Sequence, residues 1–140
     1  MGSSFVQLHV YLVWSTLLRT PWLSAEYAKR VHGYVATRCR ALRCDAIAVG
    51  GVADHLHVLA MLSPAISVAQ LVNGIKAPTT TFIKREFGLF DFAWQSGYGA
   101  FSLAPSDLET VRGYVINQER HHANREIVPS WEVVEVEGGG

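Results

Sequence analysis

Two histidines spaced two residues apart lie near the middle of the chain, in His55-Leu56-His57. They begin an apolar run over residues 55–62 that is typical of a β-strand, and side chains two apart on a strand point to the same face of its sheet. Two neutral imidazoles on one face can supply half of a site for a divalent transition metal. Because ordinary half-buried histidines show the same spacing, the pattern needs further ligands before it indicates a metal site.

Polar side chains also share one face of the last predicted helix. Tyr114 and Gln118 are four residues apart, which makes them neighbours on a helix surface. The 3.6-residue period places His121 and Arg125 on the same face. An adjacent apolar stripe can dock the helix on a sheet; it consists of Leu108, Val111 and Val115. The competing interpretation is a solvated polar face with a tyrosine at its margin.

The elements that must position these residues follow from periodicity and turn residues. Strands are predicted over residues 5–14, 45–52, 55–62 and 98–103, and helices over 24–42, 67–87 and 106–125. This order predicts an α+β fold, namely a ferredoxin-like or RRM-like βαββαβ antiparallel sheet with helices on one face, plus a C-terminal helix. Such a fold serves many functions, so the site must decide which one applies.

Four local signals refine these bounds: capping boxes at Ser67 with Gln70 and at Ser106 with Glu109, a proline at 78, and the pair Gly50-Gly51. The boxes predict helix starts. The proline is expected to kink or break its helix, because it lacks a backbone donor. The paired glycines predict a β-bulge in the second strand.

Composition limits the class of protein. A chain of 140 residues with 49% hydrophobic and 17% charged residues is expected to form one folded domain rather than a disordered chain. No apolar run approaches the ~20 residues that span a bilayer. Cys39 and Cys44 are expected to be free thiols in a reducing compartment, which favours a cytoplasmic protein.

Three segments in order resemble a known family: Asp54-His55-Leu56-His57-Val58-Leu59, Trp94-Gln95-Ser96-Gly97-Tyr98-Gly99-Ala100-Phe101-Ser102 and Tyr114-Val115-Ile116-Asn117-Gln118-Glu119-Arg120-His121-His122. They are similar to the single-tyrosine HUH transposases of small bacterial insertion sequences, the IS200-like or TnpA-type transposases. Residues 9–16 resemble the first strand of that family, and the likeness covers residues 7–125.

The resemblance implies a specific chemistry. His55, His57 and Gln118 would bind a divalent metal, Mg²⁺ or Mn²⁺, and Tyr114 on the C-terminal helix would be the nucleophile that attacks single-stranded DNA. Asp54 and His121 are candidates for orienting an imidazole or moving a proton; an Asp in a hairpin turn can instead bond its own backbone. The family further implies a homodimer and DNA hairpins at the ends of a mobile element as the substrate.

The charge of the chain is compatible with DNA binding when residues 1–125 and 126–140 are counted separately. The formal net charge is zero, which alone argues against a nucleic-acid-binding surface. Residues 126–140 form an acidic, Gly-rich tail of charge −4, so a single domain over residues 1–125 carries +4. Candidate DNA-binding residues are Arg38, Arg40, Arg43, Lys76, Lys84, Arg85 and Arg125. A solvated charged surface is the alternative for these side chains.

Two other functions remain open at this point. The first keeps the chemistry but assigns it to a domesticated, repeat-associated transposase acting as a site-specific nuclease. The second is a ferredoxin-like nucleic-acid-binding module without catalysis. A zinc-dependent hydrolase would need another strong ligand, and Asp54 is the sole carboxylate close to the histidine pair in the sequence.

Overall fold

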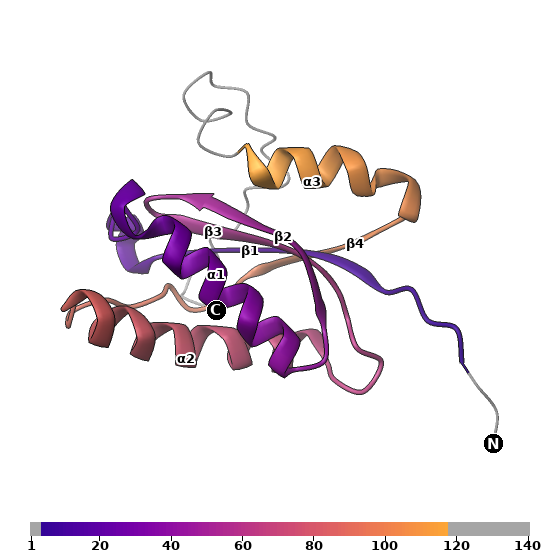
Figure 1. Ribbon diagram of the computed structural model, residues 1–140, viewed down its shortest axis with the longest axis horizontal. Coiled ribbons are helices and arrows are strands. Elements are labelled where there is room, and N and C mark those ends of the chain that lie inside the picture. The colour runs from indigo at the N-terminus through magenta and orange to yellow at the C-terminus, as the bar shows by residue number, and fades with distance from the viewer. Residues whose placement is uncertain (1–3, 118–140) are drawn as a thin grey trace.

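The computed structural model of the chain describes residues 4–117, whose path is shown in Figure 1. The strands are β1 (His9–Ser15), β2 (Asp45–Val52), β3 (His55–Met61) and β4 (Gly99–Leu103), and the helices are α1 (Ala25–Ala41), α2 (Val68–Phe87) and α3 (Leu108–Ile116). Short 3-10 turns over Leu17–Arg19 and Pro105–Asp107 follow β1 and β4. Within the described range, the helices are too short or too polar to cross a membrane.

The four strands form one antiparallel sheet in the order β2-β3-β1-β4. This arrangement confirms the predicted ferredoxin-like βαββαβ topology. In the register between the two central strands, Ser15 lies opposite His55 and Val13 lies opposite His57. The histidine pair is therefore held on an inner strand, where hydrogen bonds on both sides fix its position.

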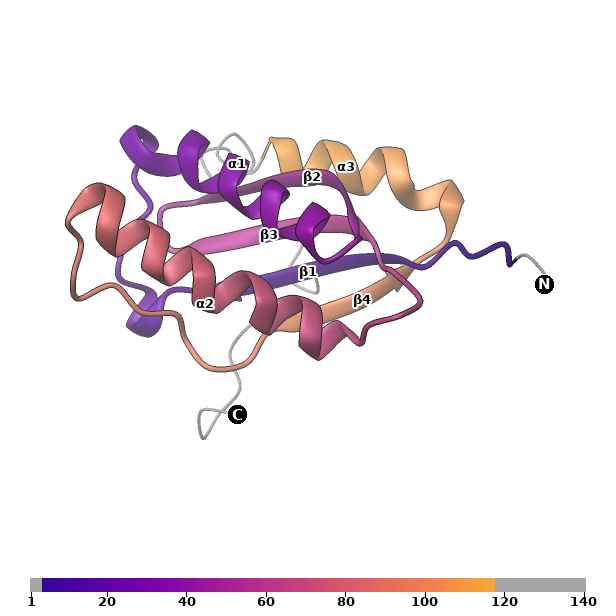
Figure 2. The same cartoon turned by 60° about the horizontal axis from the view of Figure 1, so that its bottom comes forward.

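Helices cover both faces of the sheet. Helices α1 and α2 lie side by side over one face (Figure 2), and α3 lies over the other (Figure 1). The larger core fills the α1–α2 side, with Leu12, Trp14, Leu56, Val58 and Ile75 among its members. The smaller core joins α3 to the sheet and includes Tyr11, Val13, Leu59, Val111 and Val115. Alternation along β1 and β3 explains the division, since odd-numbered residues face α3.

Helix α2 begins as the sequence predicts but is not interrupted where a break was expected. The backbone N–H of Gln70 donates to Oγ of Ser67 at 3.0 Å, and Oε1 of Gln70 accepts from the N–H of Ser67 at 2.8 Å. The helix continues through Pro78. A proline there leaves the carbonyl of Gly74 without its helical donor, and Nε of Arg38 on α1 donates to that oxygen at 3.2 Å.

Other predicted details were wrong for local reasons. Helix α3 begins at Leu108 rather than at Ser106, because Pro105 starts a 3-10 turn and Asp107 becomes the residue before the helix, without a side-chain cap. The irregularity in β2 falls between Ala46 and Ala48, not at the paired glycines. The first strand begins at His9, four residues later than predicted.

Candidate active site

The two histidines of β3 lie together on the sheet face covered by α3. Their ring centroids are 4.8 Å apart, with the planes at 62°. Both side chains are almost fully buried, His55 at 1% and His57 at 0% exposure. The strand periodicity predicted this shared face, and the structure shows the two imidazoles in contact beneath a helix.

Tyr114 reaches the same place from α3. Its side chain is 5% exposed, and its ring centroid lies 6.1 Å from that of His57 with the planes at 70°. Val111 and Val115 pack on the sheet beside it and hold the helix down. The structure therefore brings together three of the four residues to which the sequence assigns the chemistry. The fourth, Gln118, lies outside the described residues, as do His121 and Arg125.

Gly50 on β2 determines how closely α3 approaches the sheet. A Cβ atom at this position would lie 2.1 Å from the backbone oxygen of Val115. Real Cβ atoms do not approach a carbonyl oxygen this closely, so a side chain at position 50 would push the helix away. The absence of a side chain here allows Tyr114 to lie against His57.

A neighbour engages Nδ1 of each imidazole. The hydroxyl of Tyr11, on β1, hydrogen-bonds to Nδ1 of His57, and Tyr11 is 1% exposed. At His55, Nδ1 lies 2.6 Å from Oδ1 of Asp54. An ionised carboxylate only accepts hydrogen bonds, so we assign the proton to Nδ1 of His55. This tautomer leaves Nε2 with the lone pair that a metal requires.

The carboxylate of Asp54 is held in its charged form. Its pKa is lowered to about 2, first by the hydrogen bond from His55 and further by the charge of Arg19, against the opposing effect of burial. Nε of Arg19 lies 3.2 Å from Oδ2. One carboxylate oxygen therefore contacts the imidazole and the other contacts the guanidinium.

Arg19 lies in a backbone conformation that non-glycine residues rarely adopt. Its φ is 54°, and the preceding Leu18 has φ 55°, so two consecutive residues are left-handed at a cost of about 1–2 kcal/mol each. Hydrogen bonds to the turn before β3 hold the loop, since Thr16 donates to the carbonyl of Asp54 from both its N–H and its hydroxyl.

The donor set fits a divalent metal in part. Two imidazoles on one face, each with Nδ1 engaged by a neighbour, are suitable ligands for a transition metal. Within residues 4–117, no three His, Cys, Asp or Glu side chains are grouped to hold an ion. Asp54 contacts His55 and Arg19 instead of extending the ligand set. An amide ligand from position 118 would complete a site with nitrogen and oxygen donors.

The candidate DNA-binding cations within residues 4–117 lie on α1, on α2 or just after α1, on the other side of the sheet. Nζ of Lys76 donates to the carbonyls of Gln95 and Gly97 at 3.0 and 2.8 Å, and burial lowers its pKa. Arg38 caps Gly74 as described, and Arg40 donates to the hydroxyl of Thr37 at 3.2 Å. Lys76 and Arg38 join α1, α2 and the loop before β4, whereas Arg40 is exposed and bonds only to its own helix.

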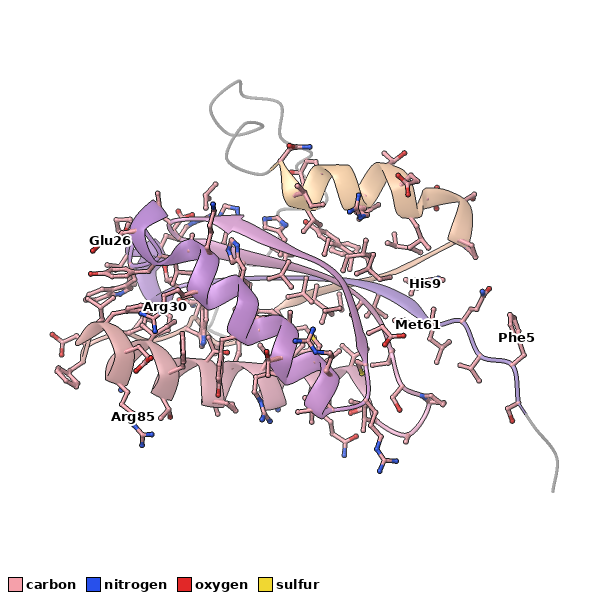
Figure 3. All side chains as sticks on the ribbon, viewed as in Figure 1. Phe5, His9, Glu26, Arg30, Met61 and Arg85 are labelled. Atoms are coloured by element: carbon pink, nitrogen blue, oxygen red, sulfur yellow. The ribbon has the colours of Figure 1, made fainter. Side chains whose placement is uncertain are left out.

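Three further cations make no side-chain hydrogen bond or ion pair to the described residues. Arg43 is exposed at the end of α1, and Arg85 projects from the outer side of α2 (Figure 3). Lys84 lines a groove of about 530 Å³ between α2 and residues 92–96. Of the predicted DNA-binding set within the described residues, these three side chains show no contact that fixes them to the fold.

Two important residues, Tyr11 and Arg19, were not identified from the sequence, and a third, Gly50, was singled out there for a different role. The alternation along β1 places Tyr11 on the sheet face that α3 covers, but its proximity to His57 depends on the register between β1 and β3. The position of Arg19 depends on a left-handed loop that no local residue pattern predicts. The paired glycines did signal a close approach, which the sequence interpretation assigned to a bulge instead of helix packing.

Comparison with known proteins agrees with the fold. The family described as "Transposase IS200 like" matches residues 4–118. The crystal structure of a Deinococcus radiodurans protein described as a transposase is similar, with a TM-score of 0.67 and 18% identity over 84% of this chain and 96% of that one. The structure of a REP-associated tyrosine transposase bound to a REP hairpin is also similar, with a TM-score of 0.61 and 13% identity over 100% of this chain and 96% of that one. No curated protein sequence matches the chain.

Proposed function

The chain belongs to the IS200-like transposase family, and from that premise we propose that it cuts and rejoins single-stranded DNA through Tyr114. The observation that carries the proposal is the placement of the Tyr114 ring beside His57, whose neighbour His55 faces the same space. A nucleophile and two metal-binding imidazoles on facing elements are the parts that a metal-assisted phosphoryl transfer requires.

In the proposed reaction the phenolic oxygen of Tyr114 forms a bond to a DNA phosphorus. The bond from that phosphorus to the 3′ oxygen of the preceding nucleotide breaks, and this oxygen takes up a proton and leaves as a 3′-hydroxyl. The product is a 5′-phosphotyrosine, and attack by a 3′-hydroxyl reverses the step. Because the phosphoester bond is conserved throughout, rejoining needs no external energy source.

The phenol needs assistance, because a tyrosine hydroxyl has an ordinary pKa of about 10. We propose that His55, His57 and Gln118 hold Mg²⁺ or Mn²⁺. When bound, the cation polarises the phosphate oxygens and stabilises the charge that develops in the transition state. Imidazole ligands suit manganese better than magnesium, which prefers oxygen donors. Because both imidazoles are buried, water has little access to the rings and the surrounding side chains keep them in place.

For the substrate we propose hairpin-forming single-stranded DNA at the ends of a mobile element, bound by a homodimer. The relative solved with a REP hairpin supports this class of ligand. Among the candidate cations within residues 4–117, Arg43, Lys84 and Arg85 make no side-chain hydrogen bond or ion pair to the described residues, and we propose that they contact phosphates. Contacts of this kind predict affinity that falls as salt rises.

The test is incubation of the protein with labelled hairpin-bearing single-stranded DNA and Mn²⁺, followed by denaturing electrophoresis. We expect a shortened strand and a protein–DNA adduct that survives detergent, and we expect a chelator to abolish both. Tyr114→Phe should form neither product. Tyr34→Phe is the matched control, because Tyr34 lies on the α1–α2 side of the sheet, away from the histidines, where its ring centroid is 4.3 Å from that of Phe82. Binding without cutting by the parent protein would favour a non-catalytic module.

A further inference from the structure

The two oxygens of the Asp54 carboxylate contact different groups, His55 and Arg19, and both contacts form only if the carboxylate keeps one orientation. Oδ1 lies 2.6 Å from Nδ1 of His55, and Oδ2 lies 3.2 Å from Nε of Arg19. Nη2 of the same guanidinium is 3.4 Å from Nδ1 of His55. Because Asp54 lies in the two-residue turn before β3, its side chain could otherwise accept a hydrogen bond from the local backbone, as turn aspartates commonly do.

The loop that carries Arg19 is strained, and the ion pair offers little stability in return. Leu18 and Arg19 are both left-handed, and such outliers persist only where the surroundings hold them. The side chains of Arg19 and Asp54 are 41% and 29% exposed, a setting in which ion pairs add little to folding. Backbone and hydroxyl hydrogen bonds hold this loop, and the loop places the guanidinium against the carboxylate that contacts the neighbouring imidazole.

We propose that Arg19 is a positioning residue that keeps Asp54 turned toward Nδ1 of His55 and thereby fixes the tautomer of that histidine. Arg19 binds Oδ2, so Oδ1 remains directed at the imidazole N–H. The Nδ1–H tautomer then keeps the Nε2 lone pair on the side where a metal would bind. The benefit of this tautomer for metal binding rests on the proposed function. The tautomer itself can be measured without metal or DNA.

The experiment compares Arg19→Gly with Leu18→Gly in the full chain. Glycine adopts a φ near 54° without strain, so Arg19→Gly removes the guanidinium and is expected to fold at least as well as the parent. Leu18→Gly relaxes the same loop and retains the guanidinium. Arg19→Lys retains the charge but lacks the planar group whose Nε contacts Oδ2.

The first measurement is the ¹⁵N chemical shifts of His55 in the metal-free protein, which distinguish protonation at Nδ1 from protonation at Nε2. We expect the parent and Leu18→Gly to hold the Nδ1–H form, Arg19→Gly to show a mixture of tautomers, and Arg19→Lys to be intermediate. The second measurement is Mn²⁺ affinity by calorimetry, where loss of a group that orients a ligand should weaken binding by about 10-fold in Arg19→Gly.

A parent-like tautomer and Mn²⁺ affinity in Arg19→Gly would overturn the proposal. Equal disturbance by Leu18→Gly would also overturn it, because loop rigidity and not the guanidinium would then hold Asp54. The outcome is separable from the proposed function. If Arg19→Gly shifts the tautomer while His55→Ala still cuts DNA, the positioning role stands and the proposed function fails.

Discussion

The ring of Tyr114 meets the imidazole of His57 edge to face, with centroids 6.1 Å apart, and both residues belong to the same chain. The contact is intramolecular, so one copy of the protein carries the tyrosine and both histidines at a single site. The family resemblance left open whether this helix would instead complete the site of a partner. We therefore expect the proposed attack by Tyr114 to take place within its own subunit.

This arrangement predicts the behaviour of mixed variants. Tyr114→Phe and His57→Ala are each expected to be inactive in DNA cleavage. If nucleophile and ligands act within one subunit, mixing the two variants leaves cleavage at the sum of their separate activities. The measurement is adduct formation after the two proteins are mixed and allowed to exchange subunits. Recovery of activity in the mixture would show that Tyr114 serves the site of a partner.

Gly50 gives a prediction about the docking of α3. Gly50→Ala should lower the free energy of unfolding by about 3 kcal/mol, because the added Cβ would lie 2.1 Å from the carbonyl of Val115. Cleavage should fall with it, since the helix that carries Tyr114 must move. The control is Gly33→Ala on α1, where no atom lies within 4 Å of the added carbon and a gain of about 0.5–1 kcal/mol is expected. Chemical denaturation measures both, and unchanged stability in Gly50→Ala would contradict the close packing.

Tyr11 gives a prediction about His57. Tyr11→Phe removes the hydroxyl that bonds to Nδ1 of His57 and keeps the ring that packs 5.8 Å from Phe101. We expect the fold to be retained and Mn²⁺ affinity to fall by about 10-fold, because the imidazole loses the group that orients it. Calorimetric titration with Mn²⁺ provides the measurement. An affinity equal to that of the parent would mean that the hydroxyl does not orient the ring.

Asp54 predicts a pH dependence of stability. Its pKa of about 2 in the folded chain is below the ordinary 3.8, so between these values the unfolded chain binds more protons than the folded one. The stabilisation is complete above about pH 4 and is lost as the pH falls toward 2, by on the order of 2 kcal/mol. Asp54→Asn should lack this component. The free energies of unfolding of the parent and Asp54→Asn should therefore differ at pH 5 and converge at pH 2, as measured by denaturation. A difference that is the same at both pH values would contradict the assigned interaction.

The sequence predicted the parts of this site that depend on local periodicity. Alternation along a strand places His55 and His57 on one face, and the apolar stripe on the last helix places Tyr114 beside a buried edge. The sheet order followed from the order of the elements. The first two patterns are each contained within one strand or one helix, so neighbouring residues suffice to reveal them.

The contacts that orient the site were not predictable in this way. Tyr11 meets His57 across 46 positions and Arg19 meets Asp54 across 35, and both contacts depend on strand register and loop conformation. The expected break at Pro78 failed for the same kind of reason, since Arg38 supplies the missing donor from a different helix, 36 positions from Gly74. Long-range pairings of this kind require the folded structure.

The proposed function requires that Tyr114, rather than Tyr11, the other tyrosine beside His57, becomes joined to DNA. The most direct measurement is mass spectrometry of the covalent protein–DNA adduct after protease and nuclease digestion, with the modified residue located by fragmentation. We expect a nucleotide-bearing phosphotyrosine at Tyr114 in the parent and in Tyr11→Phe. An adduct at Tyr11, or cleavage of DNA with Tyr114 unmodified, would contradict it.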